Sequence, residues 1–111
     1  MQLHPTIYAG VNRFIDNFTM YDKRGEVTKT FTQGMCYWFA FILHNRFPKD
    51  SEIMYYAVGN HFACRIGERV FDITGDITNK NLFFEPWEEY KLRDPLETAR
   101  LQVYCIDKTG F

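Results

Sequence analysis

Five apolar residues recur at helical spacing near the start of the chain: Ile7, Val11, Phe14, Ile15 and Phe18. This spacing predicts an amphipathic helix over residues 5–18, with Pro5 in its first turn. Residues 34–47 are apolar on nearly every side, which predicts a second, buried helix that ends before Pro48. The polar residues 19–33 predict an irregular connection between the two helices.

The middle of the chain has the pattern of β-strands. Residues 53–58 are rich in tyrosine and apolar residues, and residues 61–66 and 69–73 flank Gly67 as the two arms of a hairpin. An order of two helices followed by strands predicts an α+β fold. In this fold an antiparallel sheet packs on the buried helix of residues 34–47.

The last third of the chain mixes short elements. Residues 74–76 predict a turn, and residues 86–90 and 95–100 each begin with a proline and predict a short helix. Apolar and polar residues alternate over 101–106, which predicts a final strand. The aromatic-rich run 83–87 is expected to plug the core rather than to form an exposed lip beside a site.

Composition and charge narrow the class of protein. The chain has 111 residues, which is the size of one domain, residues 1–111. Hydrophobic residues make up 46% and aromatic residues 18%, which favours a packed core over disorder. The net charge is −1 and no basic stripe is present, so no nucleic-acid partner is predicted. The longest apolar run is under half of the roughly 20 residues that span a membrane, and the pattern leaves the oligomeric state open.

The cysteines indicate the compartment. Cys36, Cys64 and Cys105 are odd in number and form no CxxC motif, which argues against a disulfide framework and for a reducing environment. The N-terminus lacks a basic stretch followed by an apolar one, so no signal peptide is expected. We therefore expect a cytoplasmic protein, without a membrane anchor, a cofactor or a metal.

Cys36 stands at the predicted start of the buried helix. A helix N-terminus carries about half a positive charge, which favours the thiolate form of a cysteine. A thiolate that attacks a carbonyl needs a base to handle the proton and a third group to orient that base. His61 and Asp72 are candidates for these roles, because imidazole titrates near neutrality and a carboxylate can fix its tautomer.

The hairpin brings His61 and Asp72 together in either register that Gly67 allows. If Ile66 joins Gly67 in a two-residue loop, His61 lies directly opposite Asp72. If Glu68 joins Gly67 instead, His61 lies diagonal to Asp72. In both registers the two side chains share a face of the sheet and lie within reach of each other. The sequence therefore predicts a His61–Asp72 pair.

Three segments carry a resemblance to a known family. Residues 34–40 (GMCYWFA) resemble the cysteine motif of the transglutaminase-like branch of the papain-like thiol enzymes. Residues 61–67 (HFACRIG) and 70–74 (VFDIT) are similar to the histidine strand and the following aspartate strand of that family. The resemblance covers about residues 31–76, in the same order of Cys, His and Asp. Met35 departs from it, because transglutaminases proper often have glutamine there.

The resemblance implies a papain-like fold, with Cys36 at a helix N-terminus facing a small antiparallel sheet that carries His61 and Asp72. It implies acyl transfer from a protein or peptide substrate through a thioester. Water would then release the acyl group in a peptidase or amidase, and an amine would take it in a transglutaminase. The backbone N–H of Cys36 and a second donor, Gln33 or Thr32, would hold the oxyanion.

Several alternatives stay open at this point. Asp76 is a rival for the orienting role, and a zinc site built from the same triad would lack the usual paired-ligand spacing. Cys64 and Cys105 are expected in the core, and His4 and His44 at the surface or at helix ends. A second class of function is a catalytically silent binding or inhibitor protein on the same scaffold, for example one that acts in phage–host conflict.

Overall fold

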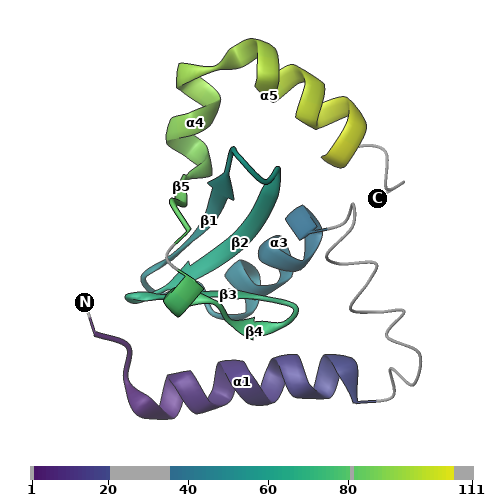
Figure 1. Ribbon diagram of the computed structural model, residues 1–111. Coiled ribbons are helices and arrows are strands. Elements are labelled where there is room, and N and C mark those ends of the chain that lie inside the picture. The colour runs from purple at the N-terminus through teal and green to yellow at the C-terminus, as the bar shows by residue number, and fades with distance from the viewer. Residues whose placement is uncertain (1, 21–35, 81, 107–111) are drawn as a thin grey trace.

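The computed structural model describes residues 2–20, 36–80 and 82–106 and has an α+β architecture (Figure 1). The helices are α1 Pro5–Thr19, α3 Cys36–Arg46, α4 Trp87–Arg93 and α5 Pro95–Leu101, with a 3₁₀ turn η1 at Thr78–Lys80 and a π-helical turn η2 at Gln102–Ile106. The strands are β1 Ser51–Tyr56, β2 His61–Ile66, β3 Arg69–Asp72, β4 Gly75–Asp76 and β5 Glu85–Pro86. They form one antiparallel sheet in the order β4-β3-β2-β1-β5.

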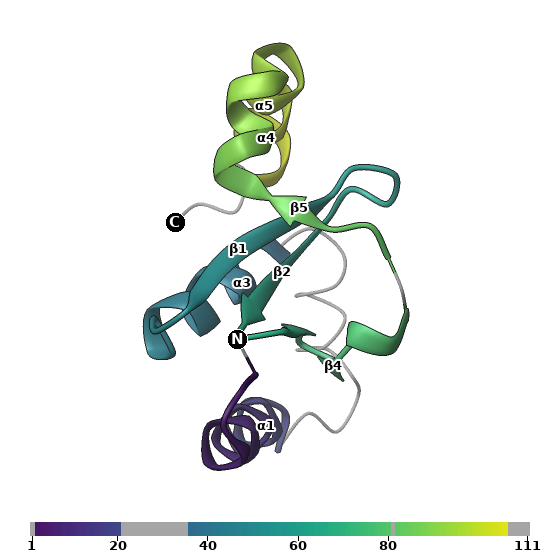
Figure 2. The same ribbon diagram turned by 90° about the vertical axis from the view of Figure 1, so that its left-hand side faces the viewer.

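The core lies between the sheet and α3, which runs along one face of β1 and β2 (Figure 2). Helix α3 is apolar from its start to Leu43, and its buried residues are Cys36, Phe39, Ala40 and Leu43. The strands contribute the fully buried rings of Tyr55, Phe62 and Phe71. Helix α1 lies near the β4 edge of the sheet, and α4 and α5 extend from the β5 edge (Figure 1). The sheet is therefore held between helices at both edges and along one face.

Most of the predicted elements are confirmed. The helices predicted at residues 5–18 and 34–47 are present as α1 and α3 over their described residues, and the two short proline-led helices as α4 and α5. The hairpin is β2 and β3, whereas the strand predicted at 53–58 begins and ends two residues earlier, as β1. Over the described ranges, no helix is long and apolar enough to cross a bilayer.

The strand predicted at residues 101–106 is wrong, because this segment is helical. Leu101 completes α5 and Ile106 ends η2, and both side chains are buried. Val103, which would share the inner face of a strand with Leu101, is 57% exposed. Leu101 and Ile106 are five residues apart, which places both on one face of a π-helical turn. The carbonyl of Ile106 accepts a hydrogen bond from Trp38 Nε1 at 3.0 Å, which fixes η2 to α3.

Gly75 carries a conformation that L-residues rarely adopt. Its φ is +111°, and no atom lies within 4 Å of the place where a Cβ would stand. We expect Gly75→Ala to lower the free energy of unfolding by about 1–2 kcal/mol from backbone strain alone. Urea unfolding measures the change. Gly10→Ala, in α1, is the matched control and should stabilise the protein by up to about 1 kcal/mol, because the nearest atom is Phe47 Cε1 at 3.9 Å. Equal effects at the two glycines would contradict this account.

Candidate active site

Cys36 is the first residue of α3, and its side chain is only 8% exposed. It belongs to the same core cluster as Phe39 and Phe62, because α3 turns its apolar surface towards β2. The thiol is free, as is that of Cys64. The helix N-terminus therefore presents a reduced thiol at the boundary between the core and the surface, with the positive end of the helix dipole beside it.

His61 is the first residue of β2, and its ring is bonded to the neighbouring strand. Nε2 lies 2.9 Å from Oδ2 of Asp72. The strands pair Ile66 with Arg69, so the loop has two residues and His61 is diagonal to Asp72, as in one of the two predicted registers. The predicted His61–Asp72 pair is confirmed. Because Asp72 occupies Nε2, Nδ1 is the ring nitrogen left for another partner.

Asp72 is held in place from its other oxygen. Its Oδ1 accepts hydrogen bonds from the backbone N–H of Thr74 at 2.8 Å and from Thr74 Oγ1 at 2.5 Å. The carboxylate is 7% exposed. Burial raises the pKa of Asp72, but the hydrogen bonds from His61 and Thr74 outweigh burial and hold the pKa below its usual value. The group is therefore a fixed carboxylate at neutral pH, with Oδ2 aimed at the imidazole.

Asp76 repeats the local structure of Asp72 but serves another contact. The sequence Asp-Ile-Thr occurs at 72–74 and again at 76–78, and Oδ1 of Asp76 accepts from the N–H and Oγ1 of Thr78 at 2.9 and 2.6 Å. Its Oδ2 accepts from the Tyr8 hydroxyl at 2.9 Å. Strand β4 pairs Asp76 with Phe71 rather than with Asp72, so the two carboxylates point to opposite faces of the sheet. Asp72, and not Asp76, therefore contacts His61.

The pKa of His61 depends on one side chain from helix α3 and one from strand β3. Burial lowers the pKa of His61, but the hydrogen bond to Asp72 and the side chain of Cys36, its second hydrogen-bonding partner, raise the pKa by more, to about 9 instead of 6.5. His61 is therefore a cation at pH 7. It lies between a carboxylate and a thiol that come from two different elements, and this is the arrangement in which cysteine enzymes keep a thiolate.

Cys64 provides an internal comparison with Cys36. It is fully buried on the core face of β2, as predicted, and burial raises the pKa of its thiol to about 12. No imidazole raises the reactivity of this thiol, since the next histidine along the strand, His61, points to the other face. The side chain of Cys105 and residues 21–35, which include Gln33 and Thr32, lie outside the described part of the structure, so the predicted oxyanion-hole donors stay predictions.

The other histidines and the possibility of a metal site can be placed within the described ranges. His4 caps α1 by accepting a hydrogen bond from the N–H of Thr6 at 3.1 Å, as expected for a helix end. His44, near the end of α3, lies 2.7 Å from Ser51 Oγ. Within residues 2–20, 36–80 and 82–106, no group of three or more His, Cys, Asp and Glu side chains is placed to hold a metal ion.

The aromatic run at 83–87 is both a core plug and an exposed lip. Trp87 is buried against Tyr55, as predicted, but Phe83 is 78% exposed. Phe84 lies between them, with its ring centroid 6.1 Å from that of His61. The alternative that the sequence left less favoured, an apolar lip beside the site, therefore holds for Phe84. Its position depends on the path of the chain from η1 to β5, for which the local sequence carries no signal.

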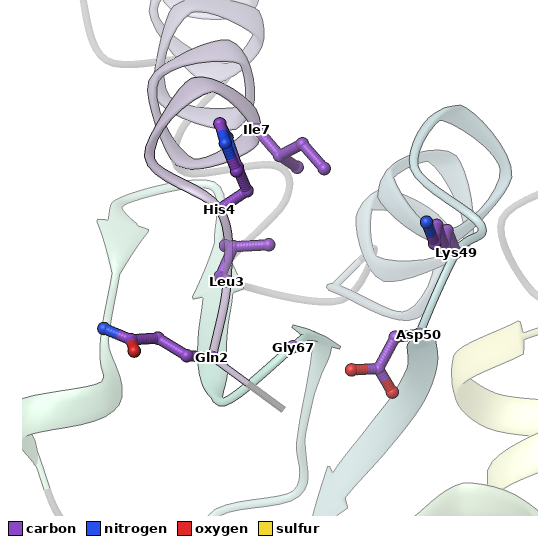
Figure 3. Close-up of a pocket in the computed structure, with 7 residues that line it drawn as sticks. All are labelled: Gln2, Leu3, His4, Ile7, Lys49, Asp50 and Gly67. Atoms are coloured by element: carbon purple, nitrogen blue, oxygen red, sulfur yellow. The ribbon is translucent and has the colours of Figure 1, made fainter.

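A small pocket lies at the opposite end of β2 from His61. It has a volume of about 110 Å³ and is formed where the start of α1 meets the α3–β1 turn and Gly67 (Figure 3). Asp50 on its wall has φ of +50° and a buried Oδ2 without a hydrogen-bond partner among the described residues. The pocket does not reach Cys36, His61 or Asp72 and is separate from the candidate site.

One comparison with known proteins gives a match. The family model described as Phage YunG-like protein matches residues 14–104, a span that includes Cys36, His61 and Asp72. No curated protein and no solved structure matches the chain. Because the family model covers far more than half of the sequence, the chain belongs to the Phage YunG-like protein family.

Proposed function

We propose that this protein is a small cysteine hydrolase or acyltransferase of the papain-like, transglutaminase-like type. Cys36 is the nucleophile, His61 the general base and acid, and Asp72 the residue that orients His61. The observation that carries the proposal is the contact of one imidazole with both Cys36 and Asp72. An ordered set of thiol, imidazole and carboxylate is the constellation that nucleophilic acyl transfer requires.

The geometry supports a two-step reaction on a protein or peptide substrate. The thiolate of Cys36 attacks the carbonyl carbon, and the carbonyl electron pair moves to the oxygen. As the tetrahedral intermediate collapses, protonated His61 gives its proton to the leaving amine and a thioester remains. Water or an amine then attacks the thioester, passes a proton to His61 and releases Cys36 as the thiolate, which restores the starting ion pair.

Asp72 supports both steps and neither gains nor loses a proton. It stays ionised because His61 and Thr74 lower its pKa, so it stabilises the imidazolium and fixes the ring. The backbone N–H of Cys36, at the start of α3, would be one donor to the oxyanion, with Gln33 or Thr32 as the second. This chemistry uses side chains and backbone groups of the protein and no cofactor.

A second candidate is a binding or inhibitor protein on the same scaffold, without turnover. The low exposure of Cys36, 8%, favours it, because a nucleophile must be reached by its substrate. A phage-related family is consistent with a role in phage–host conflict. The two candidates differ in the reactivity of one thiol, which can be measured directly.

We expect iodoacetamide to alkylate Cys36 at pH 6 at least about 10-fold faster than it alkylates a free cysteine, since a free thiol is mostly protonated there. Cys64, whose burial raises its pKa to about 12, should stay unmodified in the native protein. Peptide mapping by mass spectrometry assigns the label to each cysteine, and Cys36→Ala should remove the fast phase. A Cys36 that reacts as slowly as Cys64 would exclude the enzyme and leave the binding protein.

A screen of peptide, isopeptide and glutamine-amide substrates, with Cys36→Ala as control, then separates hydrolysis from amine transfer.

A further inference from the structure

A pocket of about 370 Å³, lined mostly by apolar side chains, lies between the sheet and the segment that follows β4. Its walls include Met54 of β1, Val70 of β3, Ile77, and the rings of Phe83 and Phe84. This volume falls in the range of small-molecule sites, about 300–1,000 Å³. None of the described residues that line it is charged.

The strand register places this pocket on the face of the sheet that carries His61. Met54 pairs with Ala63, two residues from His61, and Val70 lies two residues from Asp72. Side chains two apart on a strand share a face. Met54, Val70, His61 and Asp72 therefore line the same side of three adjacent strands, with the pocket towards β4 and the imidazole at the start of β2.

Phe84 connects the pocket to the imidazole. Its ring forms part of the pocket wall and lies 6.1 Å from the ring of His61 and 5.6 Å from that of Tyr56. Phe83, next to it, is 78% exposed at the rim. A group seated in the pocket would therefore lie one side chain away from the histidine that handles the leaving group.

The chemistry of the walls selects the occupant. Among the described residues of the lining, Thr78 is the one polar residue. Its hydroxyl donates to the carboxylate of Asp76 and accepts from the backbone N–H of Val70. The side chains that line the pocket therefore offer little hydrogen-bonding capacity to a polar ligand, whereas an apolar group would gain contact with methionine, valine, isoleucine and phenylalanine side chains.

We infer that this pocket binds a bulky apolar side chain of the substrate, on a residue adjacent to the carbonyl that Cys36 attacks. The inference rests on the proposed function and narrows its substrate class to peptides or proteins with an aliphatic or aromatic residue beside the bond. The pocket supplies binding energy at a distance from the reacting atoms, which positions the carbonyl for attack.

The test compares acetylated amino-acid chloromethyl ketones that differ in side chain: leucine, phenylalanine, glycine and aspartate. Alkylation of Cys36 is followed by mass spectrometry, and the second-order rate constants are compared. We expect the leucine or phenylalanine reagent to react about 10–200-fold faster than the glycine reagent, the range that apolar pockets reach per group. The aspartate reagent should react no faster than the glycine one.

Two variants and one control variant locate the preference in the pocket. Val70→Phe fills the cavity. It should reduce the ratio of the rate constants of the leucine or phenylalanine reagent and the glycine reagent from about 10–200 to about 3 or less. Val103→Phe makes the same chemical change at an exposed position of η2 and should keep the wild-type ratio. Phe83 is 78% exposed at the rim, so we expect Phe83→Glu to keep the fold. It should lower the rate with apolar reagents and lower it further with the aspartate reagent.

The outcomes separate the two proposals. Fast iodoacetamide labelling of Cys36 combined with equal rates for all four reagents, or with a ratio that Val70→Phe and Phe83→Glu leave intact, overturns the pocket and keeps the enzyme. Slow labelling of Cys36 by iodoacetamide and by every reagent overturns the enzyme and the pocket with it. An apolar preference that Val70→Phe removes and Val103→Phe retains supports both.

Discussion

Replacing His61 by glutamine is expected to slow the alkylation of Cys36 by iodoacetamide at least about 10-fold at pH 6, because the thiolate loses its imidazolium partner. With a pKa of about 9, His61 is protonated throughout the range in which a free thiol is mostly neutral. The difference between the wild type and the variant should therefore be largest at low pH. It should diminish as the pH rises through 9, where the wild-type imidazolium loses its proton. The same substitution should lower the rate of turnover of a substrate about 10²–10⁴-fold, since proton transfer is lost as well.

His44→Gln is the matched control for this experiment. His44 belongs to the same helix as Cys36 but lies near its other end, where it contacts Ser51. Its replacement should leave the pH–rate profile of Cys36 unchanged. If His61→Gln and wild-type protein gave profiles of the same shape, His61 would have no part in setting the reactivity of the thiol, and the site would be a core cysteine beside an unrelated ion pair.

The His61–Asp72 pair could be predicted because strand geometry offers few choices. Side chains alternate along a strand with a period of two, so a loop of even length must place these two residues on one face. Gly67, with φ of +59°, occupies the turn position that favours glycine and fixes the loop at Gly67 and Glu68. Local turn chemistry thus determined a contact between two strands.

The choice between the two aspartates could not be made in the same way. Asp72 and Asp76 begin identical Asp-Ile-Thr segments, and each uses Oδ1 to bind the threonine two residues later. The local sequence therefore does not distinguish Asp72 from Asp76. The pairing of β4 with β3 decides it, because it turns Asp76 towards Tyr8 of α1 and leaves Asp72 facing His61.

Other features depend on long-range packing that a sequence pattern does not contain. The alternation at residues 101–106 is that of a strand, but the segment is helical and a hydrogen bond from Trp38 to Ile106 fixes it to α3. The approach of Phe84 to His61 depends on how the chain returns from η1 to β5 across the sheet. Apolar periodicity identified the elements, but it could not place an aromatic residue from a connection over a particular strand.

Asp72→Asn is the second change with a large expected effect, because it reverses a hydrogen bond rather than removing it. The amide oxygen can still accept from Thr74, but the amide NH₂ then faces Nε2 of His61. A donor at this position favours the neutral ring with its proton on Nδ1, the nitrogen left for Cys36. We expect the pKa of His61 to fall well below 9 and Cys36 alkylation at pH 6 to slow about 10-fold or more, with a larger loss, up to about 10⁴-fold, on a turnover substrate.

Asp76→Asn is the matched control for this substitution. It changes the same residue type in the same Asp-Ile-Thr turn, but the contacts it weakens are those with Tyr8 and Arg69. It should lower stability while leaving the pKa of His61, followed by NMR titration of the imidazole protons, close to that of the wild type. Equal shifts of the His61 pKa in both variants would mean that general charge, rather than the bond to Asp72, controls the ring.

The pH dependence of stability provides an independent measure of the same pair. The folded protein raises the pKa of His61 from 6.5 to about 9, so the stability gained from the imidazolium is complete below pH 6.5 and is lost as the pH rises through 9. The pKa of Asp72 is lowered, so its contribution is present above its ordinary value of 3.8 and is lost as the pH falls further. Between pH 3.8 and pH 6.5 the shift of His61 corresponds to about 3 kcal/mol of the wild-type free energy of unfolding. In Asp72→Asn the His61 pKa lies nearer its unfolded value, so urea unfolding should show a smaller fall in stability between pH 7 and pH 10 than in the wild type. A variant whose stability falls as steeply as that of the wild type would show that Asp72 is not the group that holds the proton on His61.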